Sequence, residues 1–192
     1  MSTSKVISKK QVYFIGLITL FGFGIIGAII IEKTIDKSFL SIFEHGKVWY
    51  LQLLIGSLYG LATGWIAWMI IKSRLLKPVR NYYVELIQGL HLNKYEIVFL
   101  SFCAGVGEEL FFRGAIQNLL GIWITSILFI LLHGYINPLN WRLSIYGIVM
   151  VFFIAGLGYL YEYVGILSAM AAHFVIDVML LSALTLYKQD NI

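Results

Sequence analysis

Six ionisable side chains interrupt segments of the chain that are otherwise apolar. They are Glu108, Glu109 and Arg113 in one segment, His133 in the next, and His173 and Asp177 in a third. Each costs on the order of 2.5 kcal/mol or more at the centre of a bilayer, so each needs a partner or a purpose. Carboxylates and imidazoles that meet in a low-dielectric site can activate water for hydrolysis. We therefore expect these residues to face one another across a helical bundle.

Helical spacing separates the two adjacent glutamates. Residues four apart share one face of a helix, whereas neighbours point about 100° apart. Glu109 can therefore pair with Arg113, whose planar guanidinium is suited to hold a carboxylate, and Glu108 is directed elsewhere. The alternative for this pair is a purely structural role, holding helices together. His173 and Asp177 share a face by the same spacing.

Glu108 is the candidate general base, because a carboxylate buried without a charge partner accepts protons readily near neutral pH. His133 could hold or polarise the same water. His173 and Asp177 could support the oxyanion that forms when water attacks an amide carbonyl. For Asp177 this role requires protonation or an orienting contact with His173, since an ionised carboxylate only accepts hydrogen bonds.

Coordination of a zinc ion is an alternative role for the same side chains. Glu108, His133 and His173 would form a His-His-Glu set with one open position. The H-E-x-x-H spacing of zinc proteases is absent, and no serine or cysteine stands at a nucleophile-base spacing. The preferred scheme therefore requires no cofactor. Cys103, the single cysteine, is interpreted as a packing residue.

The composition places these residues in an integral membrane protein. Hydrophobic residues make up 60% of the 192 and charged residues 12%, against about 25% charged in a soluble domain. Open strands cannot cross lipid, so an all-α class is expected. A transmembrane helix needs about 20 apolar residues, which predicts about six of them. The predicted spans cover residues 12–31, 48–71, 96–113, 118–137, 143–162 and 165–186.

The residues between the spans predict topology and packing. Basic residues dominate the N-terminus and the 72–95 loop, which places both termini in the cytoplasm of a multi-pass protein of the cell membrane. The start of that loop mixes apolar and basic residues, as an interfacial amphipathic helix does. Gly56, Gly60 and Gly64 lie four apart, a stripe that favours close helix packing within the monomer over a dimer contact. Gly105 and Gly107, just before Glu108, are expected to let a substrate backbone approach.

Three motifs resemble those of the CPBP family, the CAAX protease and bacteriocin-processing group of intramembrane endopeptidases, also called Abi. The matching stretches are "EELFFR" at 108–113, "FILLH" at 129–133 and "HFVID" at 173–177, which follow the family patterns E-E-x-x-x-R, F-x-x-x-H and H-x-x-x-[N/D/B] in order. The resemblance covers about residues 96–186. It implies a four-helix catalytic core in residues 96–192, after two lead-in helices and an amphipathic linker in residues 1–95.

The resemblance also implies residue roles and an activity. Glu108 and His133 would activate water, His173 and Asp177 would support the oxyanion, and Glu109 with Arg113 would orient the site. Many family members have asparagine at the position of Asp177. The implied activity is cleavage of a membrane-associated peptide or protein, in bacteriocin or pheromone processing, self-immunity or CAAX-like processing.

The expected partners are therefore a peptide or membrane-protein substrate and the lipid bilayer, and not a nucleic acid. Intramembrane Glu, His and Asp side chains also build proton relays. The alternative function is accordingly a non-catalytic bacteriocin immunity protein or a transporter of peptides or protons, in which the polar cluster binds its ligand.

Overall fold

The computed structural model describes residues 7–34 and 38–188, and within these ranges every regular element is a helix. The expected all-α class is confirmed. Five helical stretches are long and apolar enough to cross a membrane, namely Lys9–Thr34, Trp49–Lys72, Lys94–Leu132, Trp141–Tyr163 and Ile166–Leu186. These stretches are those of a multi-pass membrane protein. The cytoplasmic location of the termini stays a prediction, and residues 1–6 and 189–192 lie outside the described ranges.

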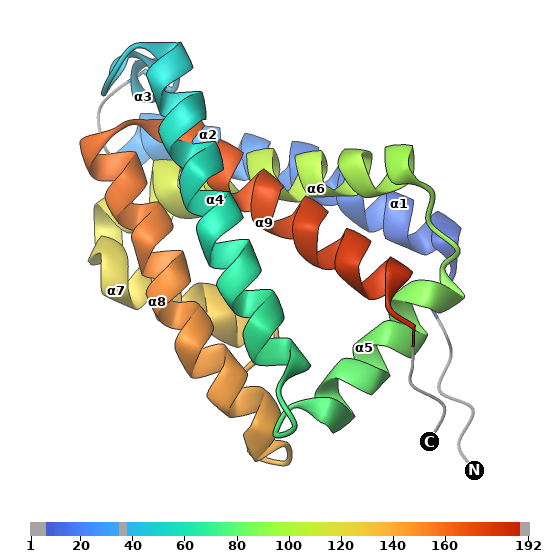
Figure 1. Cartoon of the computed structure of the whole chain (residues 1–192). Helices are drawn as coiled ribbons and strands as arrows, with labels where there is room; N and C mark the ends of the chain where they lie inside the picture. Colours follow the sequence, from blue (N-terminus) through green and yellow to red (C-terminus); the bar gives the residue numbers. More distant parts are fainter. Residues whose placement is uncertain (1–6, 35–37, 189–192) are drawn as a thin grey trace.

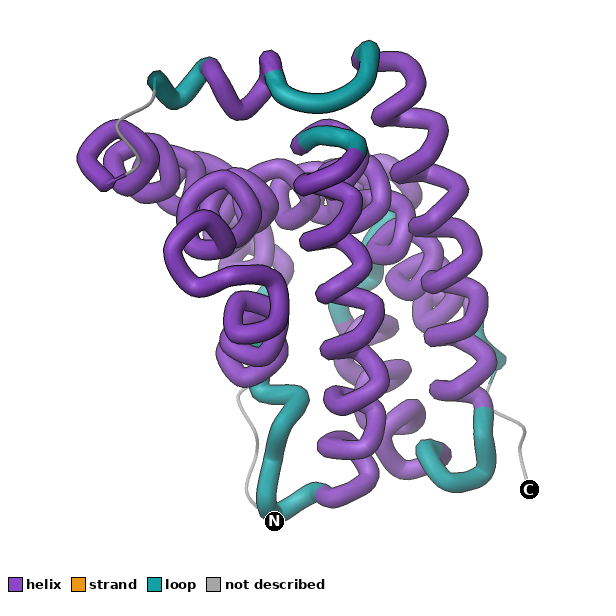
Figure 2. Tube along the Cα trace, turned by 90° about the vertical axis from the view of Figure 1, so that its left-hand side faces the viewer, coloured by secondary structure: helices purple, strands orange, loops and turns teal. Residues whose placement is uncertain are grey.

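The N-terminal half of the chain forms two of these stretches and two shorter helices. In chain order they are α1 (Lys9–Leu17), the π-helix η1 (Ile18–Phe23), α2 (Gly24–Thr34), α3 (Ser41–Glu44), α4 (Trp49–Lys72) and α5 (Lys77–Gly89). The first three are continuous. Figure 2 shows that loops lie at two opposite ends of the helical bundle.

The third stretch joins two predicted spans without a loop. α6 (Lys94–Glu109) continues through the π-helix η2 (Leu110–Ile116) into α7 (Gln117–Leu132), 39 residues in all. A straight helix of that length would measure about 58 Å, nearly twice the hydrocarbon core of a bilayer. Gly121 breaks it with a φ of 75° and a ψ of 172°, a conformation that favours glycine.

Beyond Gly121 the chain runs back along η2. The ring of Phe129 packs on that of Phe112, with centroids 4.9 Å apart. The two predicted segments are therefore present as an antiparallel hairpin. The predicted boundary between residues 113 and 118 was wrong, because the reversal lies at Gly121, where a positive φ is available, and not in the continuous helix before it.

α8 (Trp141–Tyr163) and α9 (Ile166–Leu186) complete the bundle, and α9 lies along both α4 and α6 (Figure 1). The glycine stripe of α4 makes one of these contacts. A Cβ on Gly60 would lie 2.6 Å from the carbonyl oxygen of Ala172, and one on Gly64 would lie 3.0 Å from the sulfur of Met179. The stripe packs within the monomer, as predicted, and brings α9 close to α4.

α5 crosses the C-terminal ends of α4 and α9 (Figure 1). Its polar side chains bind backbone carbonyls at the ends of these helices, which lack helical partners. Arg80 donates to the carbonyl of Lys72 at 2.8 Å, and Gln88 donates to that of Tyr187 at 2.8 Å. The predicted amphipathic helix is therefore present, with Val79 and Val84 buried on its inner face.

Candidate active site

α6 carries the two glutamates at its C-terminal end. Asn93 sets the start of this helix, because its side chain accepts hydrogen bonds from the N–H groups of Tyr95 and Glu96. Glu96 Oε2 in return accepts from the N–H of Asn93 at 2.7 Å. This reciprocal cap fixes where the helix begins. The π-helix η2 follows directly after Glu109, and π-helical turns within α-helices are frequent at functional sites.

Glu109 is fully buried and committed to two partners. Its Oε1 accepts from Nη1 of Arg113 at 2.8 Å and from Nδ1 of His173 at 2.7 Å. Arg113 is equally buried, donates from Nη2 to the carbonyl of Ile154 at 3.1 Å, and lies over the ring of Phe129. The ion pair expected from the four-residue spacing is present. It ties η2 to α8 and α9.

His173 bridges two carboxylates. Its Nδ1 binds Glu109, and its Nε2 faces Oδ2 of Asp177 at 3.6 Å. Both ring nitrogens are therefore occupied or directed by this chain's own side chains. The contact with Asp177 is the one expected from their spacing, whereas the bond to Glu109 was not foreseen. The role of these two residues at the oxyanion stays a prediction.

Glu108 turns away from the buried pair and faces His133. Its Oε2 lies 3.4 Å from Nε2 of His133 and has no hydrogen-bond partner within residues 7–34 and 38–188. Nδ1 of His133 lies 2.8 Å from the carbonyl oxygen of Phe129, so this nitrogen carries a proton. Nε2 of a neutral ring then presents a lone pair toward the carboxylate. Two acceptors at this distance need a shared proton or a donor such as water between them.

The ring of His133 has a fixed orientation although its side chain is about one-third exposed. It stacks on the ring of Phe129 with centroids 4.2 Å apart and an interplanar angle of 14°. Phe129 in turn lies under the guanidinium of Arg113. The buried pair thus helps to hold the histidine that faces Glu108.

A cavity of about 250 Å³ brings four of the six predicted residues together, and we call it the catalytic cavity. Its polar lining side chains are Glu108, His133, His173 and Asp177, with Tyr135 and Tyr146. The remaining walls are apolar. Glu109 and Arg113 do not line the cavity and lie behind it. The division of these six residues into reacting and orienting groups stays a prediction.

Tyr135 and Tyr146 are site residues that the sequence interpretation missed. Tyr135 lies in the loop between α7 and α8, and its ring meets that of Tyr146 edge to face at 5.6 Å. Burial raises the pKa of Tyr135 well above its usual range, so its hydroxyl keeps its proton. Tyrosines near span ends are common in membrane proteins, so composition offered no signal. The two-residue distance from His133 to Tyr135 is the only hint in the sequence.

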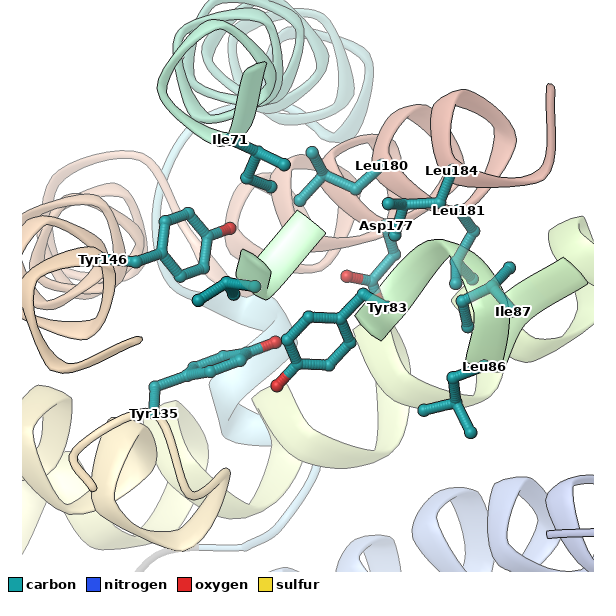
Figure 3. Close-up of a pocket in the computed structure, with 11 residues that line it drawn as sticks. Ile71, Tyr83, Leu86, Ile87, Tyr135, Tyr146, Asp177, Leu180, Leu181 and Leu184 are labelled. Atoms are coloured by element: carbon teal, nitrogen blue, oxygen red, sulfur yellow. The ribbon is translucent and has the colours of Figure 1, made fainter. Parts of the chain in front are cut away.

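A second, apolar cavity of about 230 Å³ adjoins the first (Figure 3). α5, α9 and the end of α4 supply its apolar walls, and Tyr135, Tyr146, Asp177 and Leu180 line both cavities. Figure 3 shows the carboxylate of Asp177 and the hydroxyls of both tyrosines directed into this space. The catalytic cavity therefore opens toward a volume that suits an apolar group.

Gly105 and Gly107 do not provide access for a substrate. A Cβ on Gly105 would lie 2.9 Å from the backbone nitrogen of Phe174, and one on Gly107 would collide with the backbone of Thr19. The space beside both glycines is filled by α9 and η1. The expected approach of a substrate backbone at these positions is wrong, because helix packing already uses the gap.

The residues proposed for zinc do not form a ligand set. Among the described residues, no three His, Cys, Asp or Glu side chains are arranged to hold a metal ion. His173 is directed at Glu109 and Asp177, which removes it from the set of Glu108 and His133. The chemistry of the site is therefore derived below without a metal, and chelation is the direct test of the zinc alternative.

Comparison with known proteins agrees with the motifs. Residues 91–179, which include all six predicted site residues, match the family model of Rce1-like type II CAAX prenyl endopeptidases. This stretch, a little under half of the chain, is therefore similar to a domain of this family of hydrolases, the CPBP or Abi family.

A curated relative is the "Uncharacterized protein YpbD" of Bacillus subtilis (strain 168), 39% identical over 83 residues. These residues are 42% of this chain and 41% of the relative, so the chain spans about two-fifths of the length of the curated protein it matches. No solved structure matches the chain.

Proposed function

We propose that this chain is an intramembrane endopeptidase in which Glu108 and His133 activate a water molecule. One observation carries the proposal: two adjacent glutamates have opposite environments. Each has an Oε2 without a hydrogen bond among the described residues, but Glu109 binds Arg113 and His173 through Oε1 and does not line the catalytic cavity, whereas Glu108 lines it and binds no arginine or lysine. An intramembrane carboxylate left free in this way has a function by default.

The reaction follows from the acceptors that face the cavity. A water in the cavity beside Glu108 Oε2 and His133 Nε2 can donate hydrogen bonds to these acceptors and is so held for attack. As its oxygen bonds to the amide carbon, the carboxylate of Glu108 takes the proton and the carbonyl electrons move to oxygen. Collapse of this intermediate breaks the C–N bond, and Glu108 returns the proton to the leaving nitrogen. Proton and electron pairs balance without a covalent enzyme intermediate.

The other predicted residues act on the geometry of this reaction. Glu109 and Arg113 hold η2 against α8 and α9, and so position Glu108 at the cavity. His173 and Asp177 line the cavity wall opposite α6 and contribute to the field at the reacting carbonyl. An error of about 1 Å in such positions is enough to cost a large part of the rate.

The adjoining apolar cavity supports a membrane-associated substrate. A peptide bond that reaches Glu108 would carry neighbouring apolar side chains or a lipid group into this space. Processing of peptide pheromones or bacteriocin leaders, self-immunity and CAAX-like processing are the proposed settings, in the cell membrane. We also propose a domain boundary at about residue 95 and a cytoplasmic location for both termini.

The test uses the purified full chain in lipid nanodiscs. Internally quenched peptides with varied apolar residues, each made with and without a lipid anchor, serve as probes. We expect the wild-type protein to cleave a subset of them, and Glu108→Gln to lower kcat by about 10²–10⁴-fold. Glu85→Gln, an exposed glutamate of α5 outside the site, is the matched control and should cleave like wild type.

Two results would contradict the proposal. Cleavage by Glu108→Gln at the wild-type rate would show that Glu108 is not the general base. A wild-type protein that cleaves none of the probes but still protects cells from a bacteriocin, or moves protons, would favour the non-catalytic alternative.

A further inference from the structure

Attack by water on an amide creates an oxyanion, which needs hydrogen-bond donors at the site. Most polar groups of the catalytic cavity cannot supply one. The carboxylates of Glu108 and Asp177 only accept when ionised. Nδ1 of His133 already bonds to a backbone carbonyl, and Nδ1 of His173 to Glu109. The remaining nitrogen of each histidine faces a carboxylate.

The guanidinium behind the cavity is committed as well. Arg113 donates to Glu109 and to the carbonyl of Ile154, and it does not line the cavity. By this inventory, the uncommitted donors that face the catalytic cavity are the hydroxyls of Tyr135 and Tyr146. Among the side-chain hydrogen bonds of the described residues, tyrosine hydroxyls take part at Tyr59 and Tyr161, and not at Tyr135 or Tyr146.

Tyr135 is held firmly in position. Its N–H donates to the carbonyl of Ile130 at 3.2 Å, and its carbonyl oxygen lies only 2.6 Å from where a Cβ on Gly147 would stand. Its ring lies nearly parallel to that of His133, with centroids 5.9 Å apart, and meets Tyr146 edge to face. The absence of a side chain at Gly147 is what allows the loop to bring this tyrosine to the cavity.

The position of Tyr135 favours it over Tyr146. Its ring stacks on that of His133, the proposed water-holding histidine, whereas Tyr146 meets the Tyr135 ring edge to face. Figure 3 shows the Tyr135 hydroxyl directed away from its backbone into the apolar cavity, and Tyr135 lines the catalytic cavity as well. A substrate carbonyl held by Glu108 and His133 would lie in the catalytic cavity, which Tyr135 also lines.

We propose that Tyr135 is a catalytic residue whose hydroxyl donates a hydrogen bond to the oxyanion, and that Tyr146 positions its ring. The inference rests on the proposed endopeptidase function. The O–H bond of Tyr135 does not break. The carbonyl electron pair moves to oxygen and is stabilised by the hydroxyl, and it returns to carbon as the C–N bond breaks.

The experiment compares Tyr135→Phe with Tyr146→Phe, Glu108→Gln and wild type, using the full chain in nanodiscs and the best quenched peptide found for the wild type. Phenylalanine keeps the ring and removes only the donor. We expect Tyr135→Phe to lower kcat by about 10²-fold with little change in KM, as for other single oxyanion donors. Tyr146→Phe should have a smaller effect, and Tyr163→Phe, an exposed tyrosine of α8, should cleave like wild type.

A phosphinic peptide separates this role from a structural one. Its tetrahedral phosphorus carries an oxygen where the oxyanion forms, so it binds through interactions specific to the transition state. Tyr135→Phe should weaken binding of this inhibitor by about the factor lost in kcat/KM, and should leave binding of the product peptide and the unfolding temperature unchanged. Equal weakening of inhibitor and product would overturn the catalytic role.

The possible failures are distinguishable. If wild type cleaves the peptide, Glu108→Gln does not, and Tyr135→Phe matches Tyr163→Phe, then Tyr135 has no part in the reaction while the proposed function stands. If wild type cleaves no peptide, the endopeptidase proposal fails, and the inference fails with it.

Discussion

Glu108 and Glu109 are neighbours in the chain, yet they lie in two different regions of the molecule. Glu109 lies in a closed region, where Arg113 and His173 satisfy one of its oxygens, and it does not line the catalytic cavity. Glu108 lies in an open region, where it faces the ring of His133 and lines the catalytic cavity. The closed region joins η2 to α8 and α9 through hydrogen bonds, and the open one presents a carboxylate to a cavity.

The difference shows how a membrane protein can keep a free carboxylate in place. A polar group left without partners in a low dielectric destabilises its surroundings. The ion pair one residue away compensates by tying η2 to α8 and α9. Rigidity on one face of the helix thus permits an unsatisfied acceptor on the adjacent face.

Removal of one partner from the closed region should have the largest effect. Glu109→Gln leaves Arg113 buried without its counter-ion, which typically costs about 3–5 kcal/mol. We expect an unfolding temperature lower by roughly 10 °C in a chain of this size. Glu108→Gln should leave it nearly unchanged. Thermal unfolding of both variants in the same detergent measures the contrast, and equal losses would show that the two regions do not differ in this way.

His133 and Glu108 of the open region should act together, so the effects of substituting both should not multiply. His133→Gln is expected to lower kcat by about 10²-fold, because the water loses one of its two acceptors. The double variant with Glu108→Gln should be no slower than Glu108→Gln alone, since residues that act together are not additive. Initial rates of peptide cleavage test this. Independent, multiplying losses would mean that His133 and Glu108 serve different steps.

The boundary between the two regions lies at Asp177, which faces both His173 and the cavity. Asp177→Asn keeps the shape and an acceptor oxygen but removes the charge. The lost charge-assisted contact corresponds to about tenfold in rate. We expect kcat to fall by no more than this, with an unchanged unfolding temperature. A complete loss of cleavage would assign Asp177 to the chemistry itself.

Chelation should have the smallest effect. If Glu108 acts through water alone, incubation with EDTA or 1,10-phenanthroline leaves the rate of peptide cleavage unchanged. A chelated sample to which zinc is added back is the control for recovery of activity. Loss of activity that zinc restores would establish the metal scheme and would require His133 and Glu108 to rearrange as ligands.

The sequence by itself determined the class and predicted which residues react. A 60% hydrophobic chain can satisfy its backbone in lipid only as helices, and ionisable residues are too costly there to be incidental. Four-residue spacing predicts contacts within one helix, so Glu109 with Arg113 and His173 with Asp177 could be paired in advance. These inferences use only local geometry.

Only the tertiary structure decided what meets across helices. The bond from His173 to Glu109, the reversal at Gly121 and the use of Gly105 for packing against α9 depend on which backbones approach one another. The same is true of Tyr135, which reaches the cavity from a loop because Gly147 lets that loop pack closely. Local periodicity carries no information about such contacts, since they join residues far apart in the chain.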